Sequence, residues 1–121
     1  IAMEARLLEA ELRDEIRAPF FTGTAVVEAA RRARGRGVEV LLLDDRGNGD
    51  RGEDKENEAR LRDLIVTRAT AALDEAVAGR VVVRVCPAGR RWAATILTDA
   101  GLAVVESEES TVEVGKGTLR M

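Results

Sequence analysis

The side chains available for chemistry are carboxylates, arginines, hydroxyl groups, two lysines and a single cysteine, Cys86. The chain has no histidine, which excludes Ser-His and Cys-His nucleophile pairs, imidazole zinc ligands and a phosphohistidine. One cysteine cannot form an intramolecular disulfide. Because Cys86 also lacks a neighbouring cysteine or histidine, it is interpreted as a small core residue and not as a nucleophile. No catalytic residue and no metal site is predicted.

Asp99 and Gly101 are the candidate binding residues. They belong to the tripeptide Asp99-Ala100-Gly101, which follows an apolar run typical of a strand. The simpler interpretation is a tight turn, in which the carboxylate caps the backbone and the glycine takes a positive φ. The alternative is a carboxylate that contacts a ligand. Gly115 and Gly117, on either side of Lys116, are interpreted as turn residues in the same way.

Size and charge indicate one ordinary domain over residues 1–121. The chain has a mass of 13.1 kDa, 45% hydrophobic residues and a net charge of -3, a composition that suits one modest core and a cytoplasmic protein. No apolar run is long enough to cross a bilayer. The four arginines between residues 31 and 36 are interpreted as charges that stabilise the C-terminal end of the second helix, because cations offset the helix dipole there. With a negative chain and 2% aromatic residues, nucleic-acid binding is not expected.

Two helices are expected at the start of the chain. Over residues 2–18, apolar side chains at helical spacing form a narrow stripe that stops at a proline; its members are Ala5, Leu8, Leu12 and Ile16. We expect this stripe to pack onto the domain. A thin stripe is also typical of a two-helix seam, so self-association or a protein partner at this helix is the alternative. Thr24 is the expected N-cap of a second helix that reaches about Arg34.

The remaining pattern predicts a strand over 38–43, a long and mobile loop over 44–58, a helix from about Leu61 to the stop at Gly79, and then several strands. The later strands are expected over 81–86, 92–98, 102–106 and 111–114, with a last short strand after Gly117. This order favours an α/β fold, and more specifically an α+β two-layer sandwich: a mixed, mostly antiparallel sheet with helices packed on one face.

Part of this pattern resembles the GHKL superfamily, the ATP-binding domains of bacterial sensor histidine kinases. The run from Thr70 to Ala76, followed by the strand that begins at Arg80, is similar to the N-box helix of that superfamily and its next strand. Asp99-Ala100-Gly101 matches the Asp-x-Gly of its G1 box. The resemblance covers about half the chain and implies that Asp99 and Gly101 contact adenine, so that ATP or ADP is a possible ligand.

The departures from that superfamily imply lost catalysis. The N-box asparagine that helps to hold Mg²⁺, and a glutamate one turn earlier, are replaced by Ala71 and Thr67. The ATP lid is missing as well, since strand-like residues begin at Leu102. We therefore expect a non-catalytic regulatory or protein-interaction module with no required cofactor. The alternatives are a nucleotide-binding catalytic fragment of a divergent sensor kinase and an unrelated small dimeric scaffold domain.

Overall fold

The computed structural model describes residues 2–46, 55–87, 91–106 and 111–114. Along the chain, the elements are α1 (Ala2–Arg17), the short 3-10 helix η1 (Pro19–Phe21), α2 (Ala25–Gly35), β1 (Glu39–Asp44), α3 (Lys55–Glu75), β2 (Arg80–Val85), β3 (Trp92–Thr98), β4 (Gly101–Glu106) and β5 (Thr111–Val114). The predicted order of helices and strands is confirmed for these elements. The glycine pair at 115 and 117, and the strand expected after it, lie outside the described residues.

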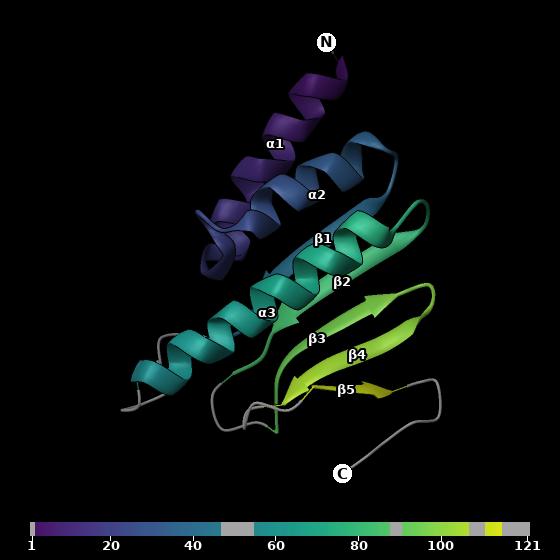
Figure 1. The fold of residues 1–121 in the computed structure, drawn as a ribbon. Coiled ribbons are helices and arrows are strands. Elements are labelled where there is room, and N and C mark those ends of the chain that lie inside the picture. Colours follow the sequence, from purple (N-terminus) through teal and green to yellow (C-terminus); the bar gives the residue numbers. More distant parts are fainter. Residues whose placement is uncertain (1, 47–54, 88–90, 107–110, 115–121) are drawn as a thin grey trace.

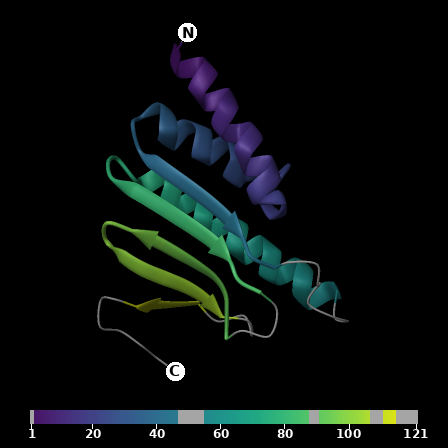
Figure 2. The same ribbon diagram turned by 180° about the vertical axis from the view of Figure 1, so that it is seen from behind.

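The five strands form one sheet in the order β1-β2-β3-β4-β5. β1 and β2 run parallel and are joined through α3, whereas each later strand is antiparallel to its neighbour. Helices α2 and α3 lie side by side on one face of the sheet, and α1 packs on α2 and β1 (Figure 1). From behind, the strands are the nearest layer and these helices lie beyond them (Figure 2). The predicted two-layer α+β sandwich with a mixed, mostly antiparallel sheet is confirmed.

The core lies between the sheet and the two helices. In β2, alternate residues are fully buried, as the two-residue period of a strand requires; Val81, Val83 and Val85 point to the helices. They meet two apolar helix faces, formed in α2 by Val26, Ala29, Ala30 and Ala33 and in α3 by Leu61, Ile65, Ala69 and Leu73. Thr24 is the N-cap of α2, as predicted, since its hydroxyl accepts a hydrogen bond from the Val26 amide at 3.2 Å.

The expected packing of the α1 stripe is wrong. Leu8, Leu12 and Ile16 are 56%, 58% and 81% exposed, so the stripe faces away from the domain. The contact with α2 is made by a different side of α1, where Ala10 is buried and Glu11 and Asp14 form ion pairs with arginines of α2. The helical period had shown which residues share a side, but ion pairing decides which side is turned inward.

The arginines of α2 hold the helices together. Arg31 pairs with Glu11 at 2.7 Å and Arg34 pairs with Asp14 at 2.8 Å, which fastens α1. On the other side, Arg32 pairs with Asp74 of α3, and the guanidinium of Arg36 donates to the Leu73 and Ala76 carbonyl oxygens at 2.6 and 2.7 Å. These carbonyls belong to the C-terminal end of α3, where a cation is favourable. The arginines of α2 therefore bind α1 and α3, in addition to the stabilising effect predicted for the end of α2 itself.

The ends of α3 differ from the prediction. The helix begins at Lys55, so the last residues of the loop expected over 44–58 are helical, and residues 47–54 lie outside the described residues. It ends at Glu75, before Val77, which is 79% exposed and not part of the inner face that the apolar spacing suggested. Gly79, at φ +83°, turns the chain into β2.

Candidate functional site

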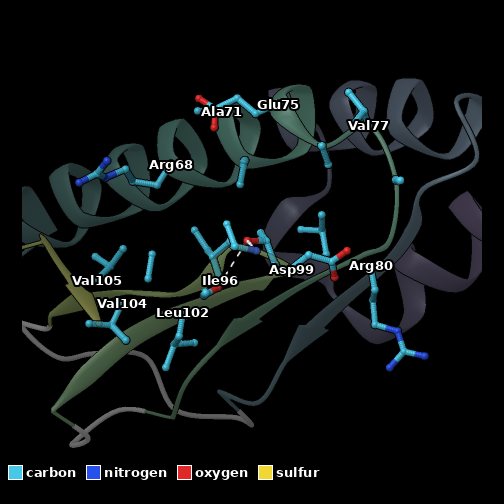
Figure 3. A pocket seen from close by; sticks show the side chains of 18 residues that line it. Arg68, Ala71, Glu75, Val77, Arg80, Ile96, Asp99, Leu102, Val104 and Val105 are labelled. Atoms are coloured by element: carbon cyan, nitrogen blue, oxygen red, sulfur yellow. Dashed lines mark hydrogen bonds between the residues drawn. The ribbon is translucent and has the colours of Figure 1, made fainter. Parts of the chain in front are cut away.

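A cavity of about 560 Å³ lies between the C-terminal half of α3 and the β3–β4 hairpin. Figure 3 shows α3 passing above it, with Ile96 and Asp99 below. Ala71 and Glu75 line it from the helix, whereas Asp99 and Gly101 line it from the hairpin. The structure therefore brings both sequence-predicted binding residues to the same cavity as the N-box-like helix.

The β3–β4 turn positions Asp99. The Thr98 hydroxyl accepts a hydrogen bond from the Ala100 amide at 3.1 Å and lies 3.4 Å from the Gly101 carbonyl oxygen. Gly101 has a φ of +141°, as the turn interpretation predicts. The side chain that supports this turn is Thr98, which leaves the carboxylate of Asp99 exposed at the cavity.

A second glycine makes room for that carboxylate. Gly79 lies directly beside the Asp99 side chain, and a methyl group at residue 79 would overlap the carboxylate. The positive φ of Gly79 also disfavours any side chain there. The connection from α3 to β2 and the turn from β3 to β4 therefore meet at one point, which is the polar end of the cavity.

The rest of the cavity is mostly apolar. Small or aliphatic side chains line it from α3, β2, β3 and β4; they include Ala71, Ala72, Ala76, Val81, Ile96, Ala103 and Val105. Among the charged lining residues, Arg80 is directed to a salt bridge with Glu39 at 3.2 Å. Asp99 and Glu75 supply carboxylates, and Arg68 supplies a cation. Such a cavity suits a small ligand that has both apolar and hydrogen-bonding groups.

Ala71, in the helix wall of the cavity, has no oxygen atom in its side chain. The two positions at which the GHKL resemblance implies magnesium-binding side chains carry Ala71, a lining residue, and Thr67, which is exposed one turn earlier. A methyl group cannot coordinate a hard cation. Within residues 2–46, 55–87, 91–106 and 111–114, no group of three or more Cys, Asp or Glu side chains is arranged to hold a metal ion.

Comparisons with known proteins find no match for the chain. No protein-family model matches it. Neither a curated protein nor a solved structure matches it. In the described part of the chain, no helix has the length and hydropathy needed to cross a membrane. Any functional assignment therefore rests on the residues and geometry of the cavity and of the helices.

Sequence reasoning missed a second cluster, at the end of β1. The Asp44 carboxylate, 4% exposed, accepts hydrogen bonds from the Phe20 amide at 3.1 Å and from the Arg46 guanidinium at 2.8 Å. Arg46 and Arg62 both lie over the Phe20 ring, at 4.8 and 4.5 Å from its centroid. The sequence does show an aromatic residue after Pro19 and an acidic residue at the end of a strand. No local pattern connects these two features, because they lie far apart along the chain.

This second cluster is structural. Burial raises the pKa of Asp44, but the hydrogen bonds and charge of Arg46, together with the Phe20 amide, outweigh burial and lower it below the usual 3.8. The same carboxylate raises the pKa of Arg46. Because this carboxylate and this guanidinium are already paired, the cluster fixes η1 against the sheet.

Proposed function

We propose that this chain is a degenerate domain of the GHKL type, which acts in the bacterial cytoplasm as a non-catalytic regulatory or protein-interaction module of signal transduction. The observation that carries the proposal is the cavity between α3 and the β3–β4 turn. Its polar end has the carboxylate and glycine that the resemblance implies for adenine, Asp99 and Gly101. Its helix wall has Ala71 where that resemblance implies a magnesium ligand.

The absence of a lid supports a loss of phosphoryl transfer. β3 ends at Thr98 and β4 begins at Gly101, so two residues connect the strands and no segment is available there to close over phosphates. Phosphoryl transfer depends on metal and donor groups that neutralise the phosphate oxygens. With Ala71 in the helix wall, the cavity lacks the magnesium ligand that the resemblance implies, and the two-residue turn supplies no lid. The chain also has no histidine that could accept a phosphoryl group.

Nucleotide binding at this cavity is the second candidate. A specific observation favours it: the exposed Asp99 carboxylate lies at the end of a cavity whose volume of about 560 Å³ is within the usual range for small-molecule sites. A carboxylate can accept a hydrogen bond from an exocyclic amino group without any metal. Under this alternative, the chain is the nucleotide-binding catalytic fragment of a divergent sensor kinase.

Isothermal titration with ATP and ADP, with and without Mg²⁺, separates the two candidates. The proposal predicts no saturable heat at millimolar nucleotide, for the natural chain and for Asp99→Ala alike. Saturable binding that Asp99→Ala abolishes would establish the second candidate instead. Asp45→Ala is the matched control, because Asp45 is an exposed carboxylate at the end of β1 that pairs with Arg84 and does not line the cavity.

The interaction role falls on α1 in this proposal. Of the six large hydrophobic side chains that are exposed in the described residues, four belong to α1: Met3, Leu8, Leu12 and Ile16. An exposed apolar row on a helix is typical of a contact with another helix. We therefore assign docking of a protein partner, or self-association, to this helix.

A further inference from the structure

The side of α1 that faces the domain is less apolar than the side that faces away from it. Among residues 3–17, those that are buried or half-buried share one helix face; they are Leu7, Ala10, Glu11 and Asp14. The opposite side carries Leu8, Leu12 and Ile16, which are each more than half exposed. A helix that packs on a core normally has the reverse arrangement.

α1 adds little to the hydrophobic core. In chain order, the core cluster begins at Ala18, after the end of α1. Ala10 is buried beside the domain, but a single methyl group stabilises far less on burial than the leucine and isoleucine side chains that α3 contributes to the core. Leu7 is half-buried and does not belong to the cluster. Apolar packing therefore holds α1 only weakly.

Two ion pairs supply the specific attachment of α1. The Glu11 carboxylate accepts a hydrogen bond from Arg31 at 2.7 Å, and the two carboxylate oxygens of Asp14 accept hydrogen bonds from Arg34 at 2.8 and 3.2 Å. When α1 moves away, these four charged groups return to water, which solvates them. Arg34 also keeps its hydrogen bond to the Val40 carbonyl oxygen. Separation therefore exposes little apolar surface and leaves the charges in water.

The chain directly after α1 is fixed to the domain. At Ala18 the backbone leaves the helical conformation, with φ −139° and ψ 64°, and this residue is only 1% exposed. Two residues later, the Phe20 amide donates to the Asp44 carboxylate at 3.1 Å. The end of α1 is thus a boundary between an element held by charge and a segment held by the core. Figure 1 shows α1 at the outer edge of the helical layer.

We infer that α1 is a detachable arm, which the Glu11–Arg31 and Asp14–Arg34 pairs hold on α2 and which separates at Ala18 while α2, α3 and the sheet stay folded. The attached form predominates, and separation frees the guanidinium groups of Arg31 and Arg34 on the surface of α2. α1 is therefore a cover for these two arginines. The inference concerns how α1 is attached and does not depend on the proposed function.

Native-state hydrogen exchange of the full chain, at low protein concentration and with mass spectrometry, tests the separation. A helix of 16 residues is marginal in water once it leaves its contacts, so the amides of α1 should exchange from the detached form. Raising NaCl from about 0.1 to about 1 M shortens the Debye length from about 10 to about 3 Å. Exchange in α1 should become at least about threefold faster, with β2 unchanged. Equal effects in α1 and β2, or no effect in α1, would overturn the inference.

Charge reversal tests the contacts that hold the arm. Glu11→Arg should speed exchange in α1 at least about threefold, because it places two guanidinium groups against each other. Adding Arg31→Glu should restore most of the protection, since the pair forms again with its signs exchanged. Glu9→Arg is the matched control: it makes the same change of charge at an exposed residue of α1 and should leave exchange unchanged. Equal acceleration by Glu9→Arg, or no restoration in the double variant, would overturn the attachment by ion pairs.

Discussion

At the scale of single residues, Asp44 joins the end of β1 to the segment before α2. Its carboxylate accepts hydrogen bonds from the Phe20 amide and from both the amide and the guanidinium of Arg46. Asp44→Asn should lower the free energy of unfolding by about 2 kcal/mol at neutral pH, because hydrogen bonds to a charged group are lost in an enclosed place. Urea denaturation of both chains measures this difference.

The pH dependence of that difference follows from the lowered pKa of Asp44. The folded chain holds the ionised form more strongly than the unfolded chain, so the stabilisation is fully present above the ordinary pKa of 3.8 and is lost as the pH falls through the folded value. The gap in stability between the natural chain and the Asp44→Asn variant should therefore shrink below pH 3.8. A gap of the same size at pH 7 and in acid, or a similar loss in Asp45→Asn, would contradict this account.

At the scale of elements, the attachment of α1 depends on Arg34. This side chain is 13% exposed and Asp14 is 16% exposed, and Arg34 also donates to the Val40 carbonyl oxygen at 2.9 Å. Arg34→Ala should cost about 2 kcal/mol, because it leaves two enclosed acceptors without their donor. Hydrogen exchange should show faster exchange in α1 and little change in β2.

Arg32, two residues before Arg34 on the same helix, provides the control variant. Arg32 pairs with Asp74, but the two side chains are 52% and 42% exposed, and an ion pair that water screens contributes little to stability. Arg32→Ala should therefore leave the exchange of α1 unchanged. Equal losses in both variants would show that the arginines act through net charge and not through enclosed contacts.

Element order was predictable because periodicity and turn residues are local signals. The alternating valines of β2 and the four-residue spacing from Leu61 to Leu73 each define a buried side without knowledge of the rest. The orientation of α1 was not predictable in this way. The spacing of Leu8, Leu12 and Ile16 defines a row, but the inward side is set by Glu11 and Asp14 through partners twenty residues away.

Part of the candidate site could also be predicted from the sequence. The resemblance to the GHKL superfamily named Asp99 and Gly101, and the fold places both at one cavity with α3. That Gly79 lies against Asp99 could not be predicted, because the contact joins the end of one connection to the tip of a separate hairpin. The cluster of Asp44, Phe20 and Arg62 was missed for the same reason, since long-range contacts leave no local pattern.

At the scale of the whole molecule, unfolding should be cooperative. One core joins α2 and α3 to the sheet, so far-UV circular dichroism and the fluorescence of Trp92, the single tryptophan, should report the same thermal transition. If α1 pairs with a second copy, the folded state is stabilised by mass action, and the midpoint should rise with protein concentration.

If α1 self-associates, Leu12→Gln should remove this dependence on concentration while leaving the two probes coincident, because Leu12 belongs to the exposed apolar row of α1 and not to the core. The midpoint of the variant should match that of the natural chain extrapolated to low concentration. A natural-chain midpoint that is the same at every concentration would mean that the stripe does not pair. Separate transitions by the two probes would mean that the helices unfold apart from the sheet, and that the shared core does not make them one cooperative unit.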